Sequence, residues 1–211
     1  MPATSMAPPG GVVASTNKGE ASARRPGRPR SEAAATAVLD AAYRLCAEAG
    51  LRGATIQAIA DASGVSKMTI YKWWPSRLHL LIDAYLREAT ATLPLSQTLP
   101  PLAAIHAHAQ RYVKALRGDL GRVQLAVLAE CWAEHGNSGL FVELYLRIRR
   151  ELGITVIRRG QQDGSIVAGG PAEALYDQIY GTIFYRCQFG LKGLTAPFIR
   201  TLVEHVLQPA A

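Results

Sequence analysis

Apolar residues recur at three- and four-residue intervals along most of the chain, which is the pattern of amphipathic helices that bury one face in a core. In the first part of the chain, hydroxyl residues precede these periodic segments and glycine or proline follows them, so both helix ends are marked. Four helices are predicted there: from the N-cap Ser31 to Gly50, from Thr55 to Ala62, from Ser66 to Trp73 or Trp74, and from Ser76 to a point before Pro94.

The stretch from Leu93 to Pro101 holds three prolines and predicts a linker between two helical modules. Beyond it, the same periodicity predicts helices near 102–117, 120–135, 138–163, 171–190 and 195–208. Gly153 and Gly160 lie inside the third of these helices, and each weakens it by roughly 1 kcal/mol. No alternating strand pattern competes with this interpretation, so the predicted fold class is all-α.

The segment from Thr55 to Tyr71 meets the physical requirements of a helix-turn-helix. Ala60 is small where the two helices would cross, and Gly64 permits the tight turn between them. Ile59, Val65 and Ile70 supply the apolar contacts that set the crossing angle. The outward positions of the second helix offer amines, a hydroxyl and aromatic rings suited to the major groove, namely Lys67, Met68, Thr69, Tyr71, Lys72 and Trp73. The alternative is a helical hairpin that serves packing alone.

The region from Thr55 to Leu81, with the sequence IADASGVSKMTIYKWWPSR at its centre, resembles the N-terminal domain of the TetR family of bacterial transcriptional regulators. The resemblance is specific over about residues 31–90. It implies that Thr55, Tyr71 and Arg77 bind DNA phosphates and that Lys67, Thr69 and Lys72 lie against bases or backbone. The predicted DNA-binding set, with the helix start and the neighbouring aromatic residue included, is Thr55, Ser66, Lys67, Thr69, Tyr71, Lys72, Trp73 and Arg77.

Two positions depart from the commoner pattern of the family. Met68 stands where glycine is frequent, and the pair Trp73 and Trp74 replaces a pair of the histidine-phenylalanine type. Trp74 precedes Pro75 and is assigned to the core, whereas Trp73 is placed beside the DNA backbone. The resemblance further implies a protein of about nine helices, in which a three-helix DNA-binding domain is linked through a fourth helix to a C-terminal ligand-sensing bundle.

The net charge of +7 is concentrated near the N-terminus. Four arginines and no acidic residue lie in residues 24–30, after a stretch rich in alanine, proline, glycine and serine that we expect to be disordered. Prolines between arginines resemble the AT-hook core, which enters the minor groove of A·T-rich DNA. The alternative is a solvated basic tail. The candidate DNA-binding residues of this arm are Arg24, Arg25, Arg28 and Arg30.

Several function classes are disfavoured by what the chain lacks. Its three cysteines are far apart, His106, His108 and His135 are too scattered for a metal site, and no apolar run reaches transmembrane length. No Ser-His-Asp set, paired carboxylates or glycine-rich phosphate loop indicates an enzyme. We therefore expect a cytoplasmic protein without metal or cofactor.

The C-terminal part contains aromatic and sulfur-bearing residues that could line an apolar ligand cavity between bundle helices. For each of them, ordinary core packing is the alternative. The candidate ligand-binding residues are Tyr112, Cys131, Trp132, Phe141, Tyr145, Tyr180 and Phe184.

The last two predicted helices carry apolar residues on more than one face, although one chain can cover only one face of each. A second copy would bury the remaining face in an isologous four-helix interface. The alternative is a helix that its own chain encloses completely. The predicted dimerisation residues are Leu175, Ile179, Ile183, Phe198, Leu202 and Val206.

Together these features predict three segments: a disordered basic arm over 1–30, a helix-turn-helix domain over 31–76, and a helical ligand-binding and dimerisation domain over 77–211. The leading hypothesis is a homodimeric repressor that a small hydrophobic ligand releases from a palindromic operator. An architectural DNA-binding protein without a ligand is the alternative. The sequence does not decide between repression and activation, nor does it identify the ligand.

Overall fold

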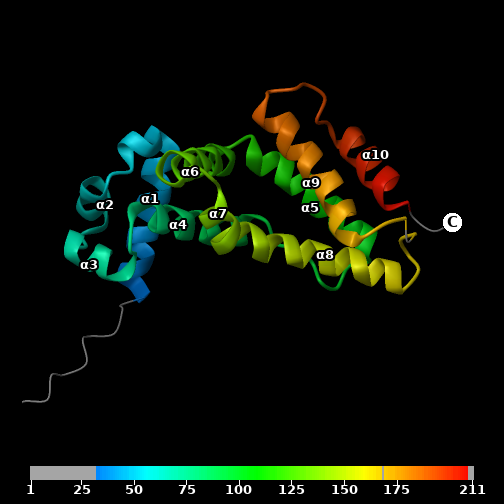
Figure 1. Cartoon of the computed structure of the whole chain (residues 1–211), viewed down its shortest axis with the longest axis horizontal. Helices are drawn as coiled ribbons and strands as arrows, with labels where there is room; N and C mark the ends of the chain where they lie inside the picture. The colour runs from blue at the N-terminus through cyan, green and yellow to red at the C-terminus, as the bar shows by residue number, and fades with distance from the viewer. Residues whose placement is uncertain (1–31, 168, 209–211) are drawn as a thin grey trace, which may run out of the picture.

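The computed structural model describes residues 32–167 and 169–208, and the elements in this part of the chain are helices (Figure 1). In chain order they are α1 (Glu32–Gly53), α2 (Ile56–Ser63), α3 (Lys67–Trp73), α4 (Arg77–Thr92), α5 (Pro101–Leu116), α6 (Asp119–His135), α7 (Gly139–Phe141), the π-helix η1 (Val142–Leu146), α8 (Arg147–Gln162), α9 (Ala172–Gln188) and α10 (Ala196–Leu207). The predicted all-α class is confirmed. The arginine-rich arm and the predicted cap Ser31 lie outside the described residues.

The predicted caps set the helix starts of the N-terminal end. The Thr55 hydroxyl accepts the backbone N–H of Ala58 at 3.1 Å, and the Ser66 hydroxyl accepts that of Thr69 at 3.3 Å. Gly64 ends α2 in the left-handed conformation with φ 69°, which turns the chain into α3. The helix-turn-helix is therefore produced by local sequence signals and is closed by the burial of Ile59 and Ile70.

Helix α1 continues one turn beyond its predicted end. The backbone leaves helical geometry at Gly50, with φ 63° and ψ −162°, and then completes a further turn to Gly53. The kink leaves the carbonyl oxygen of Leu51 available, and the side chain of Arg77 in α4 donates a hydrogen bond to it at 3.0 Å. The glycine predicted as a stop therefore changes the direction of α1 rather than ending it.

The helix predicted over 138–163 is observed as α7, η1 and α8 in direct succession. Its irregularity is the π-helical segment from Val142 to Leu146, not the two glycines. A Cβ atom at Gly153 would come within 2.3 Å of the Tyr176 ring, and one at Gly160 within 2.5 Å of Ile166. Both glycines therefore permit close packing of α8 against its neighbours.

Two hydrophobic clusters form the core, and their division does not follow the predicted boundary at residue 76. The first cluster joins α1–α4 to residues of α6, α7 and η1, among them Val123, Val127 and Phe141. The second lies among α5, α8, α9 and α10. Helix α6 therefore packs against the DNA-binding end, while α9 and α10 lie toward the opposite end of an elongated molecule (Figure 1).

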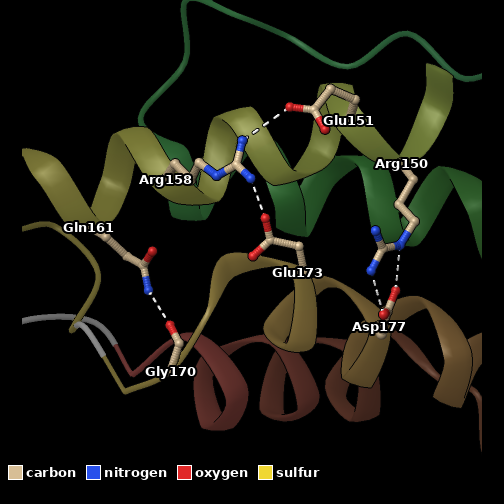
Figure 2. Close-up of polar contacts among 7 residues, drawn as sticks. All are labelled: Arg150, Glu151, Arg158, Gln161, Gly170, Glu173 and Asp177. Carbon is tan, nitrogen blue, oxygen red and sulfur yellow. Dashed lines mark hydrogen bonds and ion pairs between the residues drawn. The ribbon is translucent and has the colours of Figure 1, made fainter. Parts of the chain in front are cut away.

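Polar contacts fasten α9 to α8 on the outside of the second cluster (Figure 2). Arg150 binds both oxygens of Asp177, at 2.9 and 2.6 Å, while Arg158 bridges Glu151 and Glu173. Such exposed pairs contribute little stability individually, at most about 1 kcal/mol each. They lie across α8 and α9, the two helices that form one wall of the cavity described below.

Candidate DNA-binding surface and ligand cavity

The outward face of α3 is an exposed surface with two amines. Lys67, Met68, Tyr71 and Lys72 are exposed, with Met68 at 85% and Tyr71 at 54% of their full accessibility. On the opposite side, Ile70 is fully buried and holds the helix against the core. The side of α3 that faces away from the core is therefore open to a partner.

The other predicted residues of this surface take more local roles. The hydroxyls of Thr55 and Ser66 cap α2 and α3, and the half-buried Thr69 hydroxyl lies 3.0 Å from that of Ser66. A capping hydroxyl accepts a backbone N–H and retains its own hydrogen, which it can donate to a phosphate. Within the Ser66 and Thr69 pair one hydroxyl donates to the other, so Thr55 and one member of that pair keep a hydroxyl hydrogen for DNA contact.

The two tryptophans at the C-terminal end of α3 lie in different environments. Trp74 is buried, and its indole N–H donates to Asp83 Oδ2 at 2.8 Å. Trp73 is half-buried and meets Trp74 edge to face, with ring centroids 5.7 Å apart. Trp74 thus anchors the end of α3 to α4, and Trp73 keeps part of its ring at the surface.

Arg77 does not fit the phosphate-binding role that the resemblance implies. One guanidinium nitrogen donates to the Leu51 carbonyl oxygen, and the other forms an ion pair with Glu130 of α6. Glu130 is a buried carboxylate, which requires a nearby cation to offset its loss of hydration. The charge of Arg77 is therefore used within the chain, where it joins α4 to both α1 and α6.

A cavity of ≈ 410 Å³ lies between the two hydrophobic clusters. Its walls come from α5, α6, α7, η1, α8 and α9, from Leu93 after α4, and from Ser138 before α7. Five of the seven predicted ligand residues line it: Tyr112, Phe141, Tyr145, Tyr180 and Phe184. The structure therefore brings together aromatic side chains that are up to 72 positions apart in the sequence.

Cys131 and Trp132 do not line this cavity, contrary to expectation. Cys131 is fully buried in the first hydrophobic cluster, and Trp132 is 60% exposed to solvent. The α6 residues that do face the cavity are Gln124 and Leu128, which are four positions apart and share one side of the helix. The next residue in that row is Trp132, but it lies beyond the cavity wall.

Several polar lining residues were missed by the sequence interpretation, chiefly His108, Gln124, Arg149 and Tyr176. His108 lies four positions before Tyr112 on α5, so its helical spacing from a predicted residue was the available signal. Arg149 carried the same signal, because it lies four positions after the predicted residue Tyr145. Gln124 carried none, because a polar residue on a helix normally faces solvent.

His108 is held as a neutral imidazole within this cavity. Burial, together with the positive charges of Arg149 and Arg111, lowers the pKa of His108 to about 3. Arg149 can only donate, so His108 Nε2, 3.2 Å from its guanidinium nitrogen, must accept. The proton of the neutral ring then resides on Nδ1 and is donated to the Tyr180 hydroxyl oxygen at 2.7 Å. The Tyr180 hydroxyl hydrogen is left to donate elsewhere.

The cavity wall is hydrogen-bonded directly to α4, the helix that follows α3. The Tyr85 hydroxyl of α4 donates to Gln124 Oε1 at 2.8 Å in a buried hydrogen bond. The Tyr85 ring also meets the rings of Tyr145 and Phe141, at centroid distances of 4.7 and 5.7 Å. A change at Gln124 or Tyr145 is therefore transmitted to α4 through direct contacts.

The six predicted dimerisation residues divide into two groups. Leu175, Ile179 and Ile183 are buried in the second hydrophobic cluster of their own chain, so this face of α9 cannot meet a partner. Phe198, Leu202 and Val206 of α10 are only half-buried. The exposed stripe of α9 lies on the other side of that helix and consists of Ala174, Gln178, Gly181, Tyr185 and, just past its end, Phe189.

That stripe has two features of an interface. Tyr185 and Phe189 are 58% and 70% exposed, and their rings lie against one another at 5.1 Å. Ala174 and Gly181 are small, and a Cβ added at Gly181 would meet nothing within 4 Å in this chain. Small residues beside exposed aromatic rings allow a second helix to approach closely.

Within residues 32–167 and 169–208, no three histidine, cysteine, aspartate or glutamate side chains gather as a set of metal ligands. Among the described helices, none has both the length and the apolarity required to cross a membrane.

Two family models match the chain. Residues 38–84 match "Bacterial regulatory proteins, tetR family", and residues 101–206 match "Tetracyclin repressor-like, C-terminal domain". The HTH-type transcriptional regulator YdeS of Bacillus subtilis (strain 168) is 31% identical over 182 residues, which cover 86% of this chain and 92% of that protein.

Two solved structures show the same architecture. The TetR family transcription regulator SCO0332 superposes with a TM-score of 0.73 at 26% identity, over 85% of this chain and 100% of its own. The regulator FadR from Bacillus subtilis, solved in complex with stearoyl-CoA, superposes with a TM-score of 0.61 at 18% identity, over 83% of this chain and 99% of its own.

Replacement of Glu130 by glutamine should lower the free energy of unfolding by about 1–2 kcal/mol, because the half-buried Arg77 guanidinium loses its counter-charge while the shape of the side chain is retained. Chemical denaturation of the purified protein measures the change. Glu134→Gln removes an exposed carboxylate from the same helix and should alter stability by less than about 0.5 kcal/mol. Equal effects of the two substitutions would contradict the structural role of the ion pair.

Acidification should destabilise the fold through His108. Its pKa is about 3 in the folded chain and about 6.5 when unfolded, so below pH 6.5 only the unfolded state takes up this proton. Stability is therefore lost as the pH falls, by about 1.4 kcal/mol at pH 5.5. Between pH 7.5 and 5.5, the free energy of unfolding should therefore fall by about 1.4 kcal/mol less in His108→Gln than in the wild type. Identical pH profiles would refute a neutral, buried His108.

Proposed function

The chain belongs to the TetR family of bacterial transcriptional regulators, and we propose that it is a dimeric repressor that a small apolar ligand releases from a palindromic operator. The proposal rests on two features of the same chain. Helix α3 presents an exposed surface, and the cavity wall is hydrogen-bonded to α4, the helix that follows α3. Lys67, Tyr71 and Lys72 provide the DNA-facing groups, and Gln124 and Tyr85 provide the link.

DNA binding is supported by the chemistry of α3. Its exposed amines can neutralise phosphates or bind guanine edges, and its phenol can donate to a phosphate. Thr55 and Ser66 add hydroxyls at the starts of α2 and α3. We leave Arg77 out of the proposed DNA contacts, because its guanidinium already binds Glu130 and Leu51.

Ligand response is supported by the position and composition of the cavity. Its volume lies within the usual range for small-molecule sites, and its lining is mainly aromatic and aliphatic. A ligand that displaces Gln124 or tilts Tyr145 would shift the contacts that hold Tyr85 and hence α4. Such a shift changes the separation of two recognition helices in a dimer, and operator affinity depends on that separation.

Dimerisation is supported by the exposed stripe of α9 together with the half-buried face of α10. Phe198, Leu202 and Val206 extend the apolar surface that Tyr185 and Phe189 begin. A twofold axis through this surface would bury both helices of each copy against their equivalents. It would also leave the two DNA-binding ends free, because α9 and α10 lie toward the other end of the molecule (Figure 1).

Operator binding should depend on α3. Tyr71→Ala and Lys72→Ala should each weaken binding to the DNA upstream of the protein's own gene by roughly 10-fold. When the logarithm of the DNA-binding constant is plotted against the logarithm of the salt concentration, Lys72→Ala should make the slope shallower by about one. Gel shifts at several salt concentrations measure both effects, and a footprint should show a bounded palindromic site. Lys114→Ala removes an exposed lysine from α5 and is the control. Unbounded protection would instead indicate an architectural DNA-binding protein.

The dimer surface is tested by Gly181→Arg. A Cβ at this position would meet nothing within 4 Å in the single chain, so the fold should persist while the long cation blocks the interface. Gly181 also lines the cavity, so this variant is used to test assembly and not ligand binding. Sedimentation or light scattering should then show a monomer whose circular dichroism matches that of the wild type. Gly169→Arg, in the loop before α9, serves as the control and should remain dimeric. A dimeric Gly181→Arg protein would rule out this surface.

A further inference from the structure

The cavity wall carries one positive charge that the described part of the chain does not neutralise. Arg149, Arg150 and Asp177 are its charged lining residues, and Arg150 binds both oxygens of Asp177 (Figure 2). Arg149 donates instead to neutral acceptors, namely the Leu93 carbonyl oxygen, His108 Nε2 and the Tyr145 hydroxyl. No carboxylate among the described residues lies within ion-pair distance of Arg149.

An uncompensated charge in this position is unfavourable. Arg149 is half-buried beside an apolar space, where a charge loses hydration and where an opposite charge would interact more strongly than in water. His108 cannot supply a second charge, because its Nε2 accepts from Arg149 and its single proton is donated to Tyr180. The net charge of the lining is therefore +1, from two arginines and one aspartate.

The remaining lining indicates the rest of the ligand. Leu128, Phe141, Tyr176 and Phe184 present hydrocarbon and aromatic surface around the guanidinium. Arginine presents a planar set of donors that matches the two oxygens of a carboxylate. One uncompensated charge suits a monoanion, whereas a phosphate or a coenzyme A thioester would bring more negative charge than this wall balances.

We propose that the effector of this protein is an apolar carboxylic acid, bound as its carboxylate by Arg149 with its hydrocarbon body among the aromatic residues. The assignment rests on the proposed function, since it names the ligand class of the regulatory cavity. It makes Arg149 the residue that distinguishes acids from neutral molecules of the same shape.

The test uses matched acids and amides with the full chain. Binding of decanoate and decanamide, and of 2-naphthoate and 2-naphthamide, is measured by calorimetry at pH 7.5, where both acids are ionised. At least one acid should bind about 10- to 100-fold more tightly than its amide, the range expected for a charge-assisted contact. Arg149→Gln should abolish that preference and Arg149→Lys should retain part of it.

Arg158→Gln is the matched control, because Arg158 lies on the same helix, binds Glu151 and Glu173, and does not line the cavity (Figure 2). It should keep the full preference for the acid. The proposal is overturned if neither acid is preferred over its amide, or if Arg149→Gln retains the preference.

Gel shifts with the same protein preparations separate this result from the proposed function. Operator binding without any preference for the acids would overturn the ligand class alone. Loss of acid binding in Arg149→Gln, with operator binding preserved, supports the carboxylate contact and shows that the variant is folded. A wild-type protein that binds no operator would overturn the repressor function instead.

Discussion

The structure depends on the packing of α6 against α1 and α4. Two polar contacts lie within this apolar interface: the ion pair of Arg77 with the buried Glu130, and the hydrogen bond of Tyr85 with Gln124. Buried polar groups are costly unless they are paired, so these contacts allow one arrangement of the helices and penalise others. They join the end that holds the helix-turn-helix to the wall of the cavity, beside the first hydrophobic cluster.

Under the proposed function, these contacts are the route by which the cavity, which no residue of α3 lines, would regulate DNA binding. The aromatic residues that line it, Tyr145 and Phe141, also touch Tyr85 on α4. A ligand does not need a long chain of intermediates, because one side chain separates the cavity from the helix that follows the recognition helix. If the contacts of Tyr85 differ between the ligand-bound and the DNA-bound forms, that difference would couple the two binding events by about 1–3 kcal/mol.

The cavity itself combines an apolar wall with a small set of fixed polar groups. Arg149, His108 and Tyr180 form a chain of hydrogen bonds whose direction is determined by the obligatory donor at one end. This chain fixes which atoms donate into the cavity before any ligand enters, which reduces the cost of ordering on binding. Arg150 and Asp177 meanwhile neutralise one another and hold α8 to α9.

Local signals in the sequence determined the helix-turn-helix. Thr55, Gly64 and Ser66 act on their immediate neighbours, so the caps, the turn and the exposed face of α3 follow from short-range chemistry. Periodicity similarly revealed the all-α class and most helix positions. Only the tertiary structure decided which face of α9 is buried, why Gly153 and Gly160 are tolerated, and that Arg77 binds Glu130 rather than remaining free for phosphate. These outcomes depend on residues far apart in the chain, and periodicity identifies an apolar face without identifying what covers it.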